Sequence, residues 1–343
     1  MSAAPSPSAT TQASNRFVAD HLDAARALGE RLVDLVADPD AFVAAMHEGF
    51  AEMADATCID GVRRVTPGLG PILGVRLPLI DAAHKAFRKG AKRSPTALLL
   101  EVMDRLLREE PRELRWFGMW NLDRLLPADP ERTWQLLRRA AGEADEWITV
   151  DTLAHPYGEG ILRDPRRWAE LQQLVYSRSR WERRLVGSTV ATLPHVKRVA
   201  GGKDKAVAAR GLTLIGELIG DAEPDVQKAL SWALRTMAEV DPVATIAFLR
   251  AETDTARATA DGHRAWVIRD SLNKLPDETA AALRALLEGL RRRPDVPSTS
   301  RAATTAVGPA PAAATARTAT ATELVTAGAA PRPAQAPGRT SAT

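Results

Sequence analysis

The stretch ALLLEVMDRLLREE, residues 97–110, carries the apolar spacing that decides the fold class. Its large apolar residues recur three and four positions apart, so Leu99, Met103 and Leu106 share one face of a helix. Charged residues occupy the opposite face. The stretch therefore predicts an amphipathic α-helix that buries one side against the rest of the protein.

The same helical spacing extends outward over most of residues 15–292. It is clearest in FVADHLDAARALGERLVDLV (17–36), TWQLLRRAA (133–141) and TAAALRALLEGL (279–290). No run of alternating β-branched and polar residues predicts a sheet. We therefore predict an all-α protein.

Helix starts recur along the chain as a capping residue followed by proline, a combination that favours the first helical turn. Five such pairs occur: Asp38-Pro39, Ser94-Pro95, Asp129-Pro130, Asp164-Pro165 and Asp241-Pro242. The last four lie 35, 35 and 77 residues apart, and the longest interval is close to twice the others. A helical signature with such a period is typical of HEAT or armadillo repeats. We predict HEAT-like helix pairs stacked into a curved solenoid, with a plain helical bundle as the alternative.

The two ends of the chain differ in composition from this core. Residues 1–14 and 293–343 are rich in Ala, Pro, Ser and Thr, which predicts two disordered tails around a helical domain over residues 15–292. The N-terminus lacks a basic region followed by an apolar core, and no apolar run approaches the roughly 20 residues of a membrane span. Cys58 is the only cysteine, which excludes an internal disulfide and a cysteine-rich zinc site. These features predict a cytoplasmic, monomeric protein that does not associate with membranes.

Positive charge is concentrated in one part of the sequence, although the formal net charge of the chain is only +3. Residues 163–210 contain 12 Lys and Arg but only 4 Asp and Glu. This excess favours a polyanionic partner, with nucleic acid as the leading candidate. The alternative is a solvated helix surface without a partner.

The segment EWITVDTLA, residues 146–154, predicts a helix with an unusual pair of side chains. Asp145 is the expected N-cap residue. Trp147 and Asp151 are four residues apart, so both project from one helical face, while the intervening apolar residues are buried. An indole and a carboxylate that lie side by side can together bind a cation.

Residues 177–194, SRSRWERRLVGSTVATLP, predict a second helix that Pro194 ends. Arg183 and Arg184 are adjacent and leave this helix about 100° apart, so they cannot face the same partner. We expect one of them to pair with Glu182 or Glu170 and the other to bind phosphate. The chain has no HExxH motif, glycine-rich phosphate loop or GxSxG elbow, and its histidines lack metal-ligand spacing. The sequence therefore predicts no metal and no cofactor.

Four segments resemble the AlkD family of DNA alkylation-repair glycosylases, which are built of HEAT-like repeats. LGVRLP (73–78) is similar to a family helix entry, although Leu77 replaces the Thr that often precedes the proline. EWITVDTLA (146–154) resembles the Trp-x-x-x-Asp motif, and SRWERRLVG (179–187) the Trp-x-x-Arg segment. VQKALSWALR (226–235) resembles a Gln-Lys-Ala-x-x-Trp-x-Leu-Arg segment. The four occur in order, at intervals of about one repeat, and span most of residues 70–250.

The resemblance implies a glycosylase that excises cationic N3- or N7-alkylated purines from double-stranded DNA and needs no cofactor. It places the catalytic carboxylate on Asp151, the two site aromatics on Trp147 and Trp232, and a functional arginine on Arg184. We also expect DNA contacts from neighbouring cations, namely Arg183, Arg180, Arg178 and Lys228. The carboxylate would stabilise the oxocarbenium-like sugar that forms as the base leaves. The alternatives are a helical-repeat protein that binds damaged or branched DNA without catalysis, and a protein-interaction scaffold.

Overall fold

Residues 9–306 are described by a computed structural model, and helices form nearly all of their regular structure. Within these residues there is no β-strand, and the only β-type pairing is an isolated bridge between Ala54 and Val75. The prediction of an all-α protein is confirmed.

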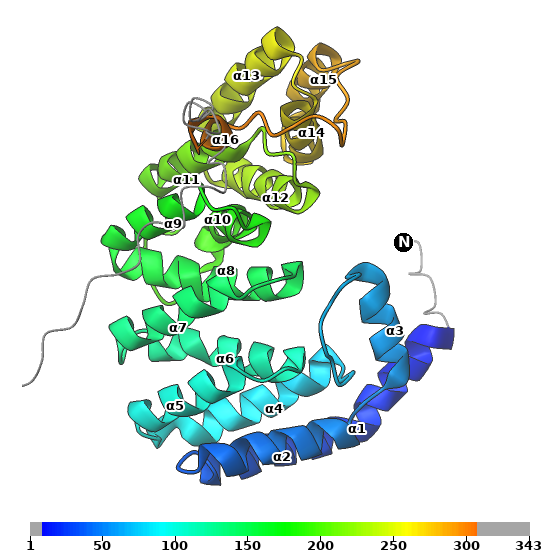
Figure 1. The fold of residues 1–343 in the computed structure, drawn as a ribbon, viewed down its shortest axis with the longest axis vertical. Coiled ribbons are helices and arrows are strands. Elements are labelled where there is room, and N and C mark those ends of the chain that lie inside the picture. The colour runs from blue at the N-terminus through cyan, green and yellow to red at the C-terminus, as the bar shows by residue number, and fades with distance from the viewer. Residues whose placement is uncertain (1–8, 307–343) are drawn as a thin grey trace, which may run out of the picture. The chain divides into compact units, whose positions relative to one another are not determined.

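The helices pack as two layers, and the chain alternates between them (Figure 1). In the first layer each helix contacts the next one. Its members are α4 (Leu77–Gly90), α6 (Arg112–Leu125), α8 (Trp147–Arg163), α10 (Arg180–Thr192), α12 (Pro224–Val240) and α14 (Gly262–Ser271). A helix of the second layer packs against most of these. The second layer contains α2 (Pro39–Glu52), α5 (Thr96–Leu107), α7 (Pro130–Gly142), α9 (Trp168–Leu174), α11 (Lys205–Leu218), α13 (Pro242–Thr259) and α15 (Asp277–Leu286).

Side chains about one repeat apart in sequence bond to each other across neighbouring helices. Trp116 Nε1 donates to Thr149 Oγ1, 33 residues away, and Ser231 Oγ donates to Asp270, 39 residues away. This regular separation is the one expected when helix pairs stack in chain order. The contacts are therefore those expected of the stacked-pair prediction.

Most of the predicted helix starts are confirmed by their caps. The side chains of Asp38, Asp129, Asp164 and Asp241 each accept a backbone N–H of the turn that follows. Ser94 does not act in this way, because α5 begins at Thr96 after Pro95, without a side-chain cap. The Ser94 amide instead closes the preceding 3-10 turn (Ala91–Arg93) onto the Ala91 carbonyl.

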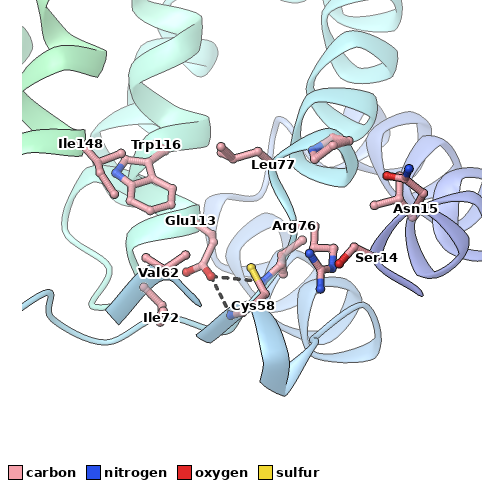
Figure 2. A pocket seen from close by; sticks show the side chains of 14 residues that line it. Ser14, Asn15, Cys58, Val62, Ile72, Arg76, Leu77, Glu113, Trp116 and Ile148 are labelled. Carbon is pink, nitrogen blue, oxygen red and sulfur yellow. Dashed lines mark hydrogen bonds between the residues drawn. The ribbon is translucent and has the colours of Figure 1, made fainter. Parts of the chain in front are cut away.

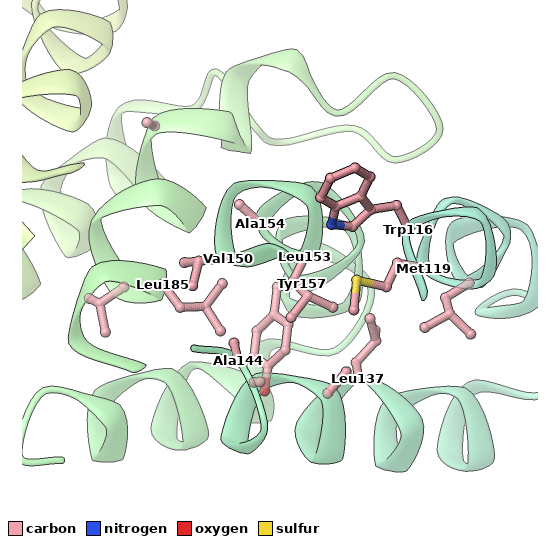
Figure 3. Close-up of a cluster of buried hydrophobic side chains, with 14 of the residues drawn as sticks. Trp116, Met119, Leu137, Ala144, Val150, Leu153, Ala154, Tyr157 and Leu185 are labelled. Atoms are coloured by element: carbon pink, nitrogen blue, oxygen red, sulfur yellow. The ribbon is translucent and has the colours of Figure 1, made fainter. Parts of the chain in front are cut away.

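Helix α8, which carries the Trp147–Asp151 pair, is longer than the sequence suggests. It continues to Arg163 through an internal Pro156, which cannot donate a hydrogen bond to the Thr152 carbonyl. An internal proline costs about 3 kcal/mol, but the buried residues on both sides of it keep the helix intact. Figure 3 shows Val150, Leu153, Ala154 and Tyr157 of this helix among the buried apolar side chains. Burial of this face turns the face with Asp151 outward.

The ordered part of the chain extends beyond the predicted domain at both ends. Helix α1 begins at Ala9 rather than after residue 14, and it packs along α4. Beyond residue 292 the chain remains attached: Thr299 donates to the Gly220 carbonyl, and α16 (Arg301–Ala306) contacts α11. Short polar residues gain backbone partners here, which composition alone does not reveal. The rest of the predicted tails, residues 1–8 and 307–343, lies outside the described residues.

The remaining elements are α3 (Ala56–Val65) and the 3-10 turns Pro165–Arg167, Leu193–His195 and Leu272–Lys274. Over residues 9–306, none of the helices combines the length and the apolar character that a membrane crossing requires.

Candidate functional site

The start of α8 fixes the orientation of the Trp147–Asp151 pair. The expected N-cap Asp145 is wrong by one residue: Glu146 caps the helix, and its carboxylate accepts Ile148 N at 2.5 Å and Thr149 N at 2.7 Å. Burial raises the pKa of the Glu146 carboxyl, and the hydrogen bonds from Thr149 oppose that shift. Asp145 instead accepts a hydrogen bond from Arg112 at 2.6 Å. Trp147 is thus the first residue of the helix, one turn before Asp151.

Asp151 is held by two side chains of the next first-layer helix. Arg184 Nε and Nη2 donate to the two carboxylate oxygens at 3.1 and 2.8 Å, and Ser188 Oγ donates to Oδ1 at 2.7 Å. Arg184 Nη1 also donates to the Asp225 carbonyl at 2.7 Å, which anchors the guanidinium to the start of α12. The Arg184 side chain is 7% exposed, whereas that of Asp151 is 23% exposed. The Asp151 carboxylate is therefore held in place by side chains of α10 and remains partly accessible to solvent.

Trp147 completes this arrangement. The guanidinium carbon of Arg184 lies 6.0 Å from the centre of the Trp147 ring. The cation that the indole and the carboxylate share in this structure is thus Arg184 itself.

The accessible side of Asp151 opens on a pocket of about 340 Å³ between α4, α6 and α8. Besides Asp151, the pocket is lined by residues that include Trp120 and Asp123 from α6 and His155 from α8. Asp123 forms ion pairs with Arg88 at 3.1 Å and with Arg198 at 3.0 Å. Carboxylates, imidazoles and an indole therefore surround one water-accessible space.

His84 of α4 forms part of the pocket wall. Its ring packs edge-on against Phe117 and Trp120, with ring centres 5.6 and 5.5 Å apart. Burial, with a contribution from the nearby Arg88 charge, lowers the pKa of His84 to about 4. Burial also lowers the pKa of His155, and the His195 charge acts in the same direction. At neutral pH the His84 imidazole is therefore uncharged.

The second predicted aromatic, Trp232, is not among the residues that line the Asp151 pocket. Trp232 lies half-buried on α12, the helix that packs against α10. Within residues 9–306 its indole forms neither a hydrogen bond nor an aromatic contact. Trp120, which is not among the predicted site aromatics, is the indole that lines the pocket with Asp151.

The predicted DNA-binding cations divide into paired and unpaired groups. Arg183 pairs with Asp221 at 2.7 Å, so the expected partners Glu182 and Glu170 are wrong. Arg180 lies over the Trp181 ring at 4.7 Å, with its guanidinium near acidic residues of the α11–α12 connection. Arg178 and Lys228 are exposed, and neither side chain has an ion-pair partner within residues 9–306. Arg184, expected at a phosphate, faces Asp151 in this structure.

The LGVRLP segment is held by a buried carboxylate. Glu113 of α6 accepts the backbone N–H groups of Leu73, Gly74 and Val75 at 3.1, 2.7 and 3.3 Å. Gly74 has a φ of 91°, which a residue with a side chain rarely adopts. The segment then enters α4 at Leu77, which is 55% exposed.

A second pocket, of about 310 Å³, lies beside this segment, and its wall is mainly apolar (Figure 2). Trp116 and Ile148 line it on one side, and Cys58 and Arg76 on the other. Burial raises the pKa of the Cys58 thiol, which keeps it protonated at neutral pH. Among the described residues, Glu113 is the only carboxylate in this pocket wall, and its oxygens bond to backbone amides.

Sequence reasoning predicted Trp147 and Arg184 as site residues, but it missed Ser188 and the pocket residues from α4 and α6. The sequence gives only a weak indication of the role of Ser188: it follows Arg184 by four positions and so shares its helical face. For the pocket residues from α4 and α6 it gives no indication, because helical spacing alone does not distinguish a side chain in a pocket from one in the core. Among residues 9–306, no group of His, Cys, Asp and Glu has the arrangement of a metal site.

Comparison with known proteins identifies the family of the chain. No curated protein and no solved structure matches the chain. A family model described as DNA alkylation repair enzyme matches residues 46–275, which include α8, α10 and α12. The chain belongs to the family of DNA alkylation repair enzymes.

Proposed function

We propose that the protein is a DNA glycosylase that releases cationic N3- or N7-alkylated purines from duplex DNA. The observation that carries this proposal is Asp151, a carboxylate fixed by Arg184 and Ser188 that opens on a pocket of about 340 Å³. Membership in the repair family supports the choice of alkylated DNA as the substrate. We further propose that the protein acts on DNA as a monomer and needs no cofactor.

The reaction begins with a base that already has a positive charge. As the bond from C1′ of the deoxyribose to the base nitrogen breaks, its electron pair moves to the base, which leaves neutral. Positive charge accumulates on the sugar. Asp151 stabilises that charge and orients a water molecule, which adds to C1′ and loses a proton to solvent. The products are the free alkylated purine and an abasic site.

Arg184 and Ser188 serve as positioning residues in this scheme. Three hydrogen bonds hold the Asp151 carboxylate in one orientation and leave one side free for the sugar. A charge that is already oriented needs no rearrangement during bond cleavage, and this lowers the free-energy barrier of the reaction. Trp147, beside this group, offers an aromatic face to a cationic base.

The decisive experiment measures release of free 7-methylguanine from methylated duplex DNA by the native protein and by Asp151→Asn. Asp145→Asn is the matched control, because Asp145 also pairs with an arginine but does not line the pocket. Base release that depends on Asp151 and not on Asp145 supports the proposal.

One observation favours the alternative of a DNA-binding protein without catalysis. Arg184 already neutralises Asp151, as it would in an ion pair that only joins two helices. That alternative predicts DNA binding with no release of base by the native protein, so the same assay separates the two functions.

A further inference from the structure

Most of the positive charge in residues 163–210 is already engaged within the protein. Eight arginines here have acidic or aromatic partners, and Arg167 also donates to two backbone carbonyls. The engaged arginines are Arg163, Arg166, Arg167, Arg180, Arg183, Arg184, Arg198 and Arg210. The charge excess visible in the sequence therefore overstates the charge available to a partner.

The cations that remain are concentrated in one connection, residues 196–205 between α10 and α11, which we call the lysine loop. Lys197, Lys203 and Lys205 are exposed, and within residues 9–306 none has an ion-pair partner. The loop contains one acidic residue, Asp204. Outside the loop, only Arg178 and Arg210 among the cations of residues 163–210 lack such a partner in the described part of the chain, and Arg210 lies over the Trp168 ring.

The backbone of the lysine loop has a defined path. Val196 N donates to the Leu193 carbonyl, and Asp204 N donates to the Gly201 carbonyl. Gly201 has a φ of 96°. A Cβ on Gly202 would lie 2.1 Å from the Leu193 carbonyl oxygen, so only glycine permits this close approach. The lysines thus extend from a fixed backbone, and binding requires ordering of their side chains only.

The loop also lies next to the candidate site. A pocket of about 290 Å³ is lined by Lys197 and Arg198 of the loop together with Asp123 and His155. Asp123 and His155 also line the pocket that contains Asp151. The two pockets share these two residues, so the loop lies beside the pocket that contains Asp151.

We propose that the lysine loop is a binding surface for the phosphate backbone of duplex DNA next to the lesion. This inference rests on the proposed function for its choice of partner. Ammonium groups act as point charges that phosphates attract without regard to base sequence. The loop holds no Asn or Gln to read a base edge. Binding through this surface positions the strand while the site beside it acts on the base.

The test compares the salt dependence of binding to an undamaged, fluorescently labelled DNA duplex. The triple variant Lys197→Gln/Lys203→Gln/Lys205→Gln removes the loop charges. The control Arg105→Gln/Arg108→Gln/Arg166→Gln removes the same number of charges from exposed arginines that are paired with acids. Because each phosphate contact contributes about 0.9 to the slope of log K against log salt, we expect the loop variant to lose about two to three units of slope. The control is expected to keep the native slope.

An unchanged slope in the loop variant would overturn the inference, and so would an equal loss in the control, which would indicate a general charge effect. Loss of binding to poly-glutamate with unchanged DNA binding would assign the loop to an acidic protein and would also overturn it. The substituted lysines are exposed, and an unchanged helical spectrum and melting temperature confirm folding. Since the duplex is undamaged, the result does not depend on catalysis: loop-dependent binding without base release would refute the proposed function alone.

Discussion

Arg184 contacts Asp151 side-on, so that both carboxylate oxygens accept hydrogen bonds from one guanidinium. The same guanidinium lies 6.0 Å from the centre of the Trp147 ring. Arg184 thus occupies the cationic position between indole and carboxylate. A positively charged sugar must therefore approach Asp151 from the pocket side, where Trp120 and Asp123 lie.

Substitution of Asp151 should affect rate more than binding. Asp151→Asn keeps the size of the side chain and removes the charge that matters only as the glycosidic bond breaks. We expect excision of 7-methylguanine to fall on the order of 10²-fold or more. Affinity for DNA should stay the same or rise, because a carboxylate repels phosphate. Single-turnover rates and binding isotherms measure the two quantities. Native-rate excision by Asp151→Asn would reassign the residue to a structural ion pair.

Arg184 should act through Asp151 and not through phosphate. Its sequence context predicts a phosphate contact, so Arg184→Ala would lower the salt slope of DNA binding by about one contact. In the structure its donors face Asp151 and a backbone carbonyl, and we expect the slope to stay unchanged. The rate of excision should fall on the order of 10²-fold, as for a misplaced catalytic group. Lys197→Gln serves as the comparison that lowers the slope without touching Asp151.

Ser188→Ala offers a milder test of the same relationship, because it removes one hydrogen bond and little volume. The Ser188 side chain is buried, and its hydroxyl donates to Asp151 at 2.7 Å. We expect at least a roughly tenfold fall in kcat, in line with about 1.5 kcal/mol, the lower end for one hydrogen bond to a charged group, with KM unchanged. A change in KM alone would show that Ser188 supports substrate binding and not the orientation of the carboxylate.

The two aromatic candidates should differ in their effects. Trp147→Ala is expected to slow excision about tenfold, because it removes one cation–π contact with the cationic base and such a contact contributes about 1–2 kcal/mol. Trp120→Ala enlarges the pocket beside Asp151, and we expect it to raise KM for the alkylated duplex. Trp232→Ala is the comparison, because its indole is not among the side chains that line the pocket. Steady-state kinetics on one duplex substrate separates these outcomes, and equal effects of Trp120 and Trp232 would contradict the assignment of the pocket.

His84 should make the fold sensitive to mild acid. Its pKa is about 4 in the folded protein, against an ordinary value of 6.5, so the unfolded chain binds the proton more readily between these values. Stability is therefore full above pH 6.5 and declines as the pH falls toward 4, by up to about 3 kcal/mol from this residue. His84→Gln should flatten the decline. Urea unfolding at a neutral pH and at two mildly acidic values measures it, and parallel curves for both proteins would show that His84 is not responsible.

The fold was largely predictable, because local signals determine it. Four of five capping residues act as expected, and the recurrence of these starts agrees with bonds between residues such as Trp116 and Thr149, one repeat apart. The prediction that Ser94 caps a helix was wrong, because a helix that begins after a proline does not require a capping side chain. The prediction covered this helix only to residue 154. Helix α8 continues to Arg163 because burial of its apolar residues outweighs the energetic cost of an internal proline.

The candidate site was predictable only in part. Helical spacing placed Trp147 and Asp151 on one face, and they do share it. Spacing within a helix does not reveal which side chain of the next repeat turns toward a carboxylate, so Arg184 was assigned to phosphate. The charge of residues 163–210 was counted correctly, but most of it is cancelled by partners such as Asp221, which are distant in sequence.

The side chains that hold Asp151 come from the helix pair that follows its own in the chain. Asp151 belongs to the α7–α8 pair, and Arg184 and Ser188 belong to the α9–α10 pair. Neither pair contains a complete site, so a repeat transplanted alone into another helical array would bring an unsupported acid or an unsupported arginine. In proteins of stacked repeats the smallest transferable unit is usually one repeat. Here it is the contact between two helix pairs, and the distance between the pairs determines whether Arg184 and Ser188 reach Asp151.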